Sequence, residues 1–203
     1  MIAWLHRHPK FRNTLIAIAL LVVLDRLFPP PIPEFGDDSA TIVLARDGTP
    51  LRAFANAEGV WRYPVTIEQV SPRYVEALLG YEDRWFWHHP GINPFAFVRA
   101  TAQAAWHGRI VSGGSTLTMQ VARLIEPIPH SAFGKIRQMI RAVQLELRLS
   151  KREILTLYLN LAPFGGSIEG VQAASFAYLG KPSAQLSHSE AALLAVLPQS
   201  PSR

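Results

Sequence analysis

Apolar residues in the middle of the chain follow the period of an α-helix. Between Lys135 and Leu149 they form one stripe, which predicts a helix that buries this face. The stripe consists of Ile136, Met139, Ile140, Val143 and Leu147. The next residues, Ser150 to Glu153, have the form of a capping box, in which a serine and a glutamate satisfy free N–H groups at a helix start. They predict a second helix from Lys151 to about Leu161.

Shorter patterns predict further helices. Ser71 and Pro72 supply an N-cap and a first helical residue, so a helix is expected to run toward Leu79 and to deliver Glu82 just past its end. Alanine-rich helices are expected at 172–181 and 189–197, the latter capped by Ser187 or Ser189. Helix therefore follows helix through most of the chain, and the predicted fold class is mainly α.

Two segments depart from the helical pattern or from ordinary solvation. Asp47–Gly48, between the apolar runs 41–45 and 51–55, predicts a small β-hairpin. Phe95 to Trp106 is unusually apolar. Such a segment is either buried core or a mobile surface that touches a membrane, and the sequence leaves both alternatives open.

The N-terminus has the pattern of a membrane anchor. Thr14 to Leu24 is apolar apart from Thr14 and follows a cluster of basic residues. A usual span takes ~20 residues, but Arg12 and Arg26 can snorkel and extend this one to roughly Phe11–Phe28. No small-x-small cleavage site follows, because Pro29 to Pro33 comes instead. We therefore predict an uncleaved transmembrane helix.

These patterns divide the chain into three parts. Residues 1–28 are expected to be a cytoplasmic tail and transmembrane anchor, residues 29–40 a stiff proline-rich linker, and residues 41–203 one domain with its own core. The basic residues before the anchor stay in the cytoplasm, so the domain should face the periplasm. The predicted location is the cell inner membrane, with a single pass.

Composition narrows the classes of partner. The formal charge of +5 and the pI of about 9.9 suit anionic lipids and diphosphates. Nucleic acid would suit this charge too, but no basic motif interleaved with aromatic residues is present, so no nucleic-acid partner is expected. Cysteine is absent and the seven histidines do not cluster, so neither a disulfide framework nor a protein-built metal site is expected.

The densest chemistry lies in the run Tyr81 to Gly91. Glu82 and Asp83 stand there among aromatic rings and next to two histidines. A carboxylate among rings loses hydration, which favours its use as a proton acceptor. The alternative is structural, with both carboxylates capping a helix end and the rings forming core.

A second run, Gly113–Gly114–Ser115, feeds a predicted helix whose N-cap is Ser115 or Thr116. Such a helix start offers free N–H groups and a positive dipole end to an anion, most often phosphate. A third run places Lys135, Gln138 and Arg141 on one stripe, with Arg137 and Arg148 adding charge nearby. Together the two runs predict a wall that binds diphosphate.

At this point the sequence resembles the peptidoglycan glycosyltransferases, family 51, which have a lysozyme-like and mostly helical fold. The first family motif corresponds to Glu82, Asp83, Phe86, His89, Gly91 and Arg99. The second corresponds to Gly114, Ser115, Thr116, Thr118 and Gln120. Lys135 fits the third, and Ile154 to Asn160 with Gly165, Gly166 and Gly170 resembles the fourth.

The resemblance implies a reaction in which a sugar 4-hydroxyl of one lipid II attacks the anomeric carbon of a growing glycan, and undecaprenyl diphosphate leaves. It implies Glu82 as the base and position 138 as the second catalytic position. The implied substrate-binding residues are Asp83, Phe86, His89, Arg99, Ser115, Thr116, Gln120, Arg123, Lys135 and Arg137. The implied partners are lipid II, the nascent glycan strand, the cytoplasmic membrane and a cell-wall synthesis complex. The sequence shows no required cofactor, although the family implies Mg²⁺ or Mn²⁺ as an ion that could bridge a diphosphate.

The chain departs from the family at two places. Position 138 usually carries an acid, whereas here it is Gln138, which cannot act as an acid or base but can donate a hydrogen bond to a phosphate oxygen. Glu146 is turned about 80° away along the helix and is not expected to replace it. Related proteins continue into a transpeptidase domain, and neither a Ser-x-x-Lys nor a Lys-Thr-Gly motif occurs here. We therefore expect a truncated chain that β-lactams do not acylate.

Three functions remain at this stage. The first is a membrane-anchored lipid II polymerase. The second is a lysozyme-like hydrolase, because one glutamic acid in an aromatic cleft also suits glycoside cleavage. The third is a glycan-binding or scaffold module with little catalytic activity. The reason to consider it is that Gln138 replaces the usual acid.

Overall fold

The computed structural model describes residues 13, 23, 25–35, 40–46, 50–107, 114–129 and 131–199. The chain divides into two compact units, residues 1–31 and 32–203. Most of the predicted anchor lies outside the described residues, as do the predicted turn Asp47–Gly48 and Gly113. Within the described part of the chain, no helix combines the length and the apolar character that a bilayer crossing requires.

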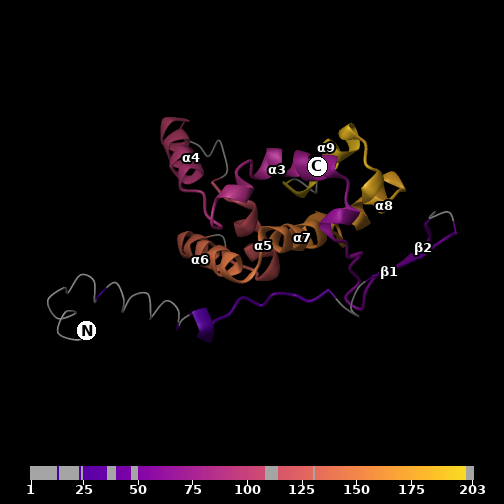
Figure 1. Cartoon of the computed structure of the whole chain (residues 1–203), viewed down its shortest axis with the longest axis horizontal. Helices are drawn as coiled ribbons and strands as arrows, with labels where there is room; N and C mark the ends of the chain where they lie inside the picture. Colours follow the sequence, from indigo (N-terminus) through magenta and orange to yellow (C-terminus); the bar gives the residue numbers. More distant parts are fainter. Residues whose placement is uncertain are drawn as a thin grey trace. The chain divides into compact units, whose positions relative to one another are not determined.

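The second unit is mainly helical, as predicted, with two small pairs of strands (Figure 1). Its α-helices are α3 (Pro72–Glu82), α4 (Pro94–His107), α5 (Leu117–Ile125), α6 (Ala132–Arg148), α7 (Lys151–Leu161), α8 (Val171–Leu179) and α9 (His188–Val196). Short 3-10 turns are η1 (Ile67–Gln69), η2 (Phe86–His88), η3 (Ser183–Gln185) and η4 (Leu197–Gln199). The capping box Ser150–Glu153 opens α7 as predicted.

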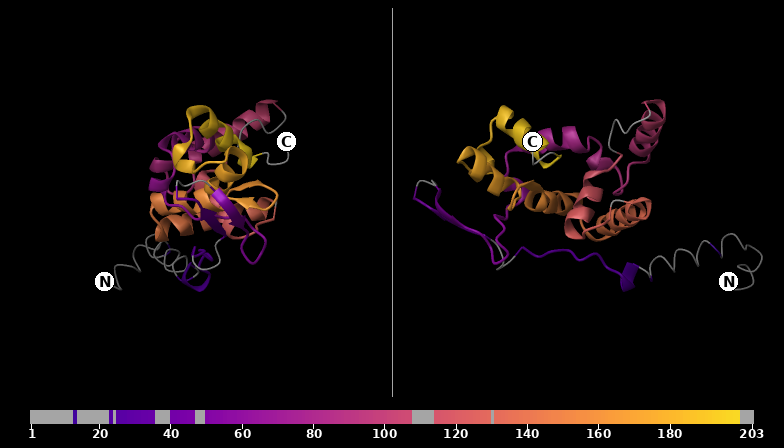
Figure 2. Two further views of the ribbon diagram at one scale, coloured as in Figure 1. Left: turned by 90° about the vertical axis from the view of Figure 1, so that its right-hand side faces the viewer. Right: turned by 180° about the vertical axis from the view of Figure 1, so that it is seen from behind.

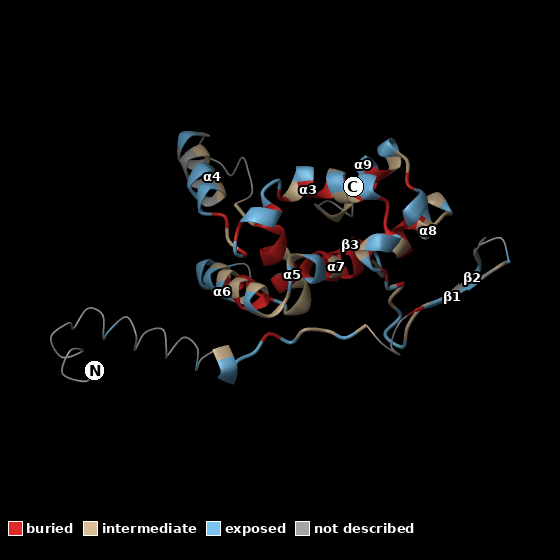
Figure 3. Cartoon of the chain, viewed as in Figure 1, coloured by how far each residue is buried: buried red, intermediate tan, exposed pale blue. Residues whose placement is uncertain are grey.

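The helices pack in two groups that share one core. Helix α3 lies against α9, while α5 packs on α6 and α7, and α8 contacts both α7 and α9. Figures 1 and 2 show these neighbours from three sides. The core joins residues of α3, α5, α7 and α9, among them Tyr74, Leu78, Leu117, Tyr158 and Leu194. In Figure 3 the buried residues concentrate in α5, in α7 and in the segment after α3.

The strands form two antiparallel pairs. Strand β1 (Thr41–Leu44) pairs with β2 (Pro50–Phe54), which confirms the predicted hairpin. The pair β3 (Pro163–Gly165) and β4 (Ile168–Glu169) was not predicted. It is formed by the glycine-rich segment after α7, where Gly166 adopts φ +55° at the turn.

Asn160 ties the end of α7 to the segment before α3. Its side-chain oxygen accepts from Val65 N–H at 2.8 Å, and its nitrogen donates to Val65 O at 2.8 Å. The side chain is buried, so both backbone groups would lack partners without it. This amide therefore fixes the segment around Val65, just before α3, on the helical core.

The predicted burial of the α6 stripe is wrong. Ile136 and Ile140 are each 56% exposed and Leu147 is 74% exposed. The buried face of α6 instead consists of Gly134, Gln138, Ala142, Gln144 and Leu145. Ala142 lies next to Gly91 of the loop after α3, and Gln138 is satisfied by hydrogen bonds where α6 meets α5. The larger apolar side chains consequently lie on the outer side.

Helix α4 decides between the two alternatives for the apolar segment 95–106. Phe95 and Trp106 are each 87% exposed, and Val98 is exposed as well. For these three side chains the buried-core alternative is therefore wrong, and Figure 3 shows exposed residues along α4. Helix α3 also differs in detail from its prediction, since it continues to Glu82, which lies in its last turn.

Gly91 allows the loop after α3 to touch the backbone of α6. It adopts φ +82°, and a Cβ added there would lie 2.8 Å from the carbonyl oxygen of Ala142. That oxygen belongs to a helix backbone and cannot move aside easily. Both the conformation and the space therefore require glycine.

We expect Gly91→Ala to lower the free energy of unfolding by about 2 kcal/mol or more, because the new methyl group meets strain and backbone atoms together. Gly80→Ala is the matched control, since Gly80 lies inside α3 and a Cβ added there would meet no neighbouring atom within 4 Å. That change should leave stability equal or raise it by up to about 1 kcal/mol. Thermal and denaturant unfolding of both variants measure the difference, and equal stabilities would contradict the assigned packing.

Candidate active site

Glu82 lies in the last turn of α3 and reaches toward α5. Its Oε2 accepts a hydrogen bond of 2.7 Å from Nε2 of Gln120. The negative charge of Glu82 interacts electrostatically with the buried phenol groups of Tyr74 and Tyr158. Burial raises the pKa of both hydroxyls, and the negative charge of Glu82 raises it further. The phenols therefore stay neutral, and the carboxylate is held by an amide that leaves it able to accept a proton.

Asp83 has a different environment from its neighbour. Its Oδ2 accepts from Leu117 N–H at 2.9 Å and lies 2.9 Å from Nε2 of His89. Asp83 and His89 are both buried. A carboxylate at this place is stabilised by the positive end of the α5 dipole. Asp83 thus joins the end of α3 to the start of α5, and His89 holds it there.

The first free N–H groups of α5 already have partners within the protein. Asp83 binds that of Leu117, and the Thr116 hydroxyl, as N-cap, accepts from Met119 N–H at 3.2 Å. The Thr116 hydroxyl also donates to the carbonyl oxygen of Gly91 at 2.5 Å. The prediction that this helix start would bind a phosphate is therefore wrong for these two donors, since a side chain of the protein fills the place.

A cluster of cations lies between α5, which carries Arg123, and the start of α6, which carries Lys135. Lys135 Nζ donates to Ser115 Oγ and, at 3.2 Å, to the side-chain oxygen of Gln138. Arg123 Nη2 donates to the same oxygen at 3.3 Å. Burial lowers the pKa of Lys135, and the charge of Arg123 lowers it further. Arg123 and Lys135 thus converge on one neutral oxygen.

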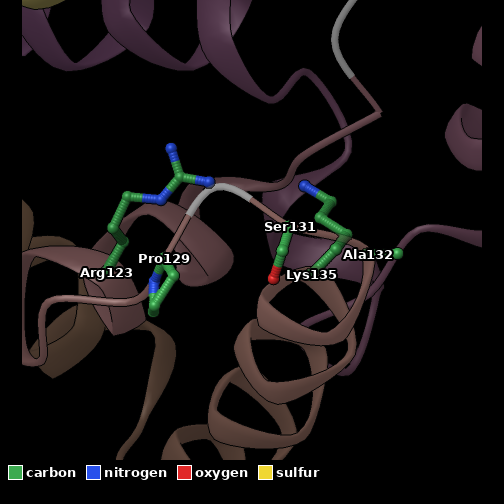
Figure 4. A pocket seen from close by; sticks show the side chains of 5 residues that line it. All are labelled: Arg123, Pro129, Ser131, Ala132 and Lys135. Carbon is green, nitrogen blue, oxygen red and sulfur yellow. The ribbon is translucent and has the colours of Figure 1, made fainter.

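An open pocket of about 380 Å³ lies beside these cations. It is lined by Arg123, Pro129, Ser131, Ala132 and Lys135. Figure 4 shows Arg123 and Lys135 on opposite sides of the pocket. Two cations at a pocket that reaches solvent suit an anionic ligand with several oxygens, such as a diphosphate.

The remaining predicted residues are not brought into this cluster. Arg137 pairs with Glu126, and Arg141 pairs with the same carboxylate at 2.8 Å. Arg99 is exposed on α4. Phe86 is fully buried in the core. Phe86, Asp83 and His89 are buried, and Asp83 and His89 contact each other, so the contact of these three residues with substrate stays a prediction.

The sequence analysis did not predict a partly buried ion pair between Lys151 and Glu146. Lys151 Nζ donates to Glu146 Oε1 at 2.7 Å and to the carbonyl oxygen of His89 at 2.6 Å. Thr118 donates to the same glutamate oxygen at 2.7 Å. These contacts hold Glu146 away from the place of Gln138, as its helical angle predicts. The only sign of this pair in the sequence was the presence of Thr118 in the second motif, and the motif did not indicate that Thr118 would contact Glu146.

The described residues include no group of three or more acidic or histidine side chains that could hold a metal ion. A pocket built from Arg123 and Lys135 repels a free cation. The residues of this part of the chain therefore do not fit a protein-built Mg²⁺ or Mn²⁺ site.

Comparison with known proteins gives consistent results. The family described as Transglycosylase matches residues 47–203. Penicillin-binding protein 1C of Escherichia coli is 63% identical over 195 residues, which cover 94% of this chain and 25% of that protein. Penicillin-binding protein 1A of Aquifex aeolicus is 41% identical over 70% of this chain, and its E. coli namesake is 36% identical over 88%.

The residues at 135–138 and 162–166 predict a likeness to penicillin-binding proteins of the 1C type. The first of these relatives is such a protein and confirms the prediction. The chain spans about a quarter of that relative and about a fifth of the A. aeolicus protein. The family match, the 1C likeness and the arrangement of Glu82, Gln120 and Lys135 agree, and the chain belongs to the transglycosylase family, glycosyltransferase family 51.

Proposed function

We propose that this chain carries a peptidoglycan glycosyltransferase, which polymerises lipid II into β-1,4 glycan strands with release of undecaprenyl diphosphate. The observation that carries the proposal is that Gln120, which holds Glu82, and Arg123, which lines the cation pocket, lie three residues apart on one face of α5. This face therefore holds a proton acceptor and, next to it, positive charge for a diphosphate leaving group. Membership of the transglycosylase family supports it.

In this mechanism Glu82 takes the proton of the 4-hydroxyl of the acceptor lipid II. The oxygen forms a new bond to the anomeric carbon of the donor glycan as the bond to the diphosphate oxygen breaks. The electron pair leaves with the diphosphate, where Lys135 and Arg123 stabilise the developing charge. Gln120 orients Glu82 through its 2.7 Å hydrogen bond. No step requires a proton from position 138, and none passes through a divalent ion.

The two alternatives differ in what they need from the pocket. A lysozyme-like hydrolase would use Glu82 as an acid and would have no use for two cations beside Ser115. A scaffold module would need neither the carboxylate nor the cations. The pocket between Arg123 and Lys135 therefore favours the transferase.

The membrane contact of the domain is part of the same proposal. Lipid II is dissolved in a bilayer, so its polymerase must reach the membrane surface. Helix α4 exposes Phe95, Val98 and Trp106, which is more apolar surface than one soluble helix usually presents to water. We place the protein at the inner membrane by its predicted anchor, with α4 in contact with lipid on the periplasmic side.

Glu82→Gln should abolish polymerisation of lipid II, at least about a thousandfold, because an amide cannot take the proton of the attacking hydroxyl. The matched control is Glu76→Gln, an exposed residue of the same helix. It should polymerise like the wild type. Labelled lipid II and gel separation of the products measure both variants, with circular dichroism to confirm folding. Glycan strands from a folded Glu82→Gln protein would refute the role of this residue.

The contact of α4 with lipid can be measured on the intact chain, because the sequence contains no cysteine. A fluorescent label on Val98→Cys should shift its emission to the blue and be quenched by brominated lipid in vesicles of phosphatidylglycerol and phosphatidylethanolamine. A label on Leu193→Cys, an exposed apolar position of α9, is the control and should stay in water. Equal quenching of the two labels, or none, would rule out a specific contact through α4.

A further inference from the structure

Gln138 is an almost fully buried polar side chain of the site. It is 1% exposed and lies on the face of α6 that meets α5. Its nitrogen donates to the carbonyl oxygen of Met119 at 2.5 Å. Its oxygen accepts from Lys135 at 3.2 Å and from Arg123 at 3.3 Å.

The chemistry of these partners fixes the orientation of the amide. Turned over, it would direct its NH₂ group at two cations and its oxygen at another carbonyl oxygen, and every contact would be repulsive. Only a group with a donor on one side and an acceptor on the other satisfies this place. A carboxylate would fit the two cations but would face Met119 O with a second oxygen.

The charges around the two cations are distributed unevenly. Among the described residues no carboxylate pairs with Lys135 or Arg123. The acid closest along α5, Glu126, is bound by Arg137 and Arg141. Glu126 thus neutralises Arg137 and Arg141. Lys135 and Arg123 have no such carboxylate partner among the described residues.

We propose that Gln138 is a positioning residue that brings Lys135 and Arg123 together without cancelling their charge, so that the pocket keeps two positive charges for a prenyl diphosphate. This inference rests on the proposed function, since it concerns the leaving group of that reaction. Gln138 itself touches no reacting atom. In this view the missing carboxylate increases anion binding and does not mark a loss of activity.

The lowered pKa of Lys135 agrees with this arrangement. Burial and the Arg123 charge both disfavour the protonated amine, and no negative group opposes them. A carboxylate at position 138 would favour the protonated form and raise this pKa. It would also place a negative charge next to any bound diphosphate.

The test is the affinity for farnesyl diphosphate, a soluble prenyl diphosphate, measured by calorimetry on the intact chain in detergent. We expect Gln138→Glu to bind it at least about tenfold more weakly than the wild type. Gln138→Met keeps the size and adds no charge, but it removes the hydrogen bonds. Its affinity for farnesyl diphosphate should fall less than that of Gln138→Glu. Gln138→Glu can still hold both cations, so it would bind better than Gln138→Met if positioning alone mattered.

Gln144→Glu is the matched control, with the same chemical change on the same helix. Its side-chain oxygen accepts from Arg141 at 2.8 Å, away from Lys135, and the variant should bind within about twofold of the wild type. The pH profile gives a second readout. Binding falls as the pH rises through the pKa of Lys135, and this fall should move to higher pH in Gln138→Glu.

If Gln138→Glu does not fold, Ser115→Asp brings a carboxylate to the same amine from a half-buried loop position and should cause the same loss. Wild-type affinity in the charged variant, tighter binding than Gln138→Met, or no binding by the wild type would each overturn the proposal. Glu82→Gln should retain diphosphate binding. Polymerisation and diphosphate binding can therefore fail separately, and each failure points to a different proposal.

Discussion

The carboxylate of Asp83 at the start of α5 is the interaction on which the site depends. It accepts from Leu117 N–H and contacts His89, so one buried group connects the end of α3, the loop that follows it and α5. Because Glu82 is the adjacent residue, this connection also determines where its side chain meets Gln120. The contact of Asp83 with the positive end of the α5 dipole thus also fixes the position of the neighbouring carboxylate, Glu82.

The close contact between α5 and α6 imposes a second constraint. On its buried face α6 meets α5 through Gln138, which donates to Met119 O, and meets the loop after α3 through Ala142, next to Gly91. Ile136, Ile140 and Leu147 then lie exposed on the outer side of α6. One packing requirement therefore accounts both for the placement of Lys135 against α5 and for the apolar outer face of the same helix.

Local signals in the sequence were enough for the helices that have explicit caps. Helix α7 begins and ends where the capping box and the apolar period place it, and β1 and β2 pair where the two apolar runs predict strands. Periodicity could show that α6 has an apolar stripe, but burial depends on which face the neighbouring helix takes, and that is a tertiary property. The stripe of Ile136 and Ile140 was assigned to the wrong side for this reason.

The site shows the same limit. Glu82 and Lys135 could be found from their motifs, whereas the partner of each charge could not. Sequence spacing gave no reason to expect Glu126 to bind two arginines, or Asp83 to fill the place predicted for a phosphate.

The amide at position 138 has a consequence for how this pocket can evolve. Glutamine and glutamate codons differ by one base, so a single nucleotide change exchanges a neutral bridge for a charged one. The electrostatic character of the pocket is therefore one mutational step from its alternative, with almost no change in the shape of the side chain.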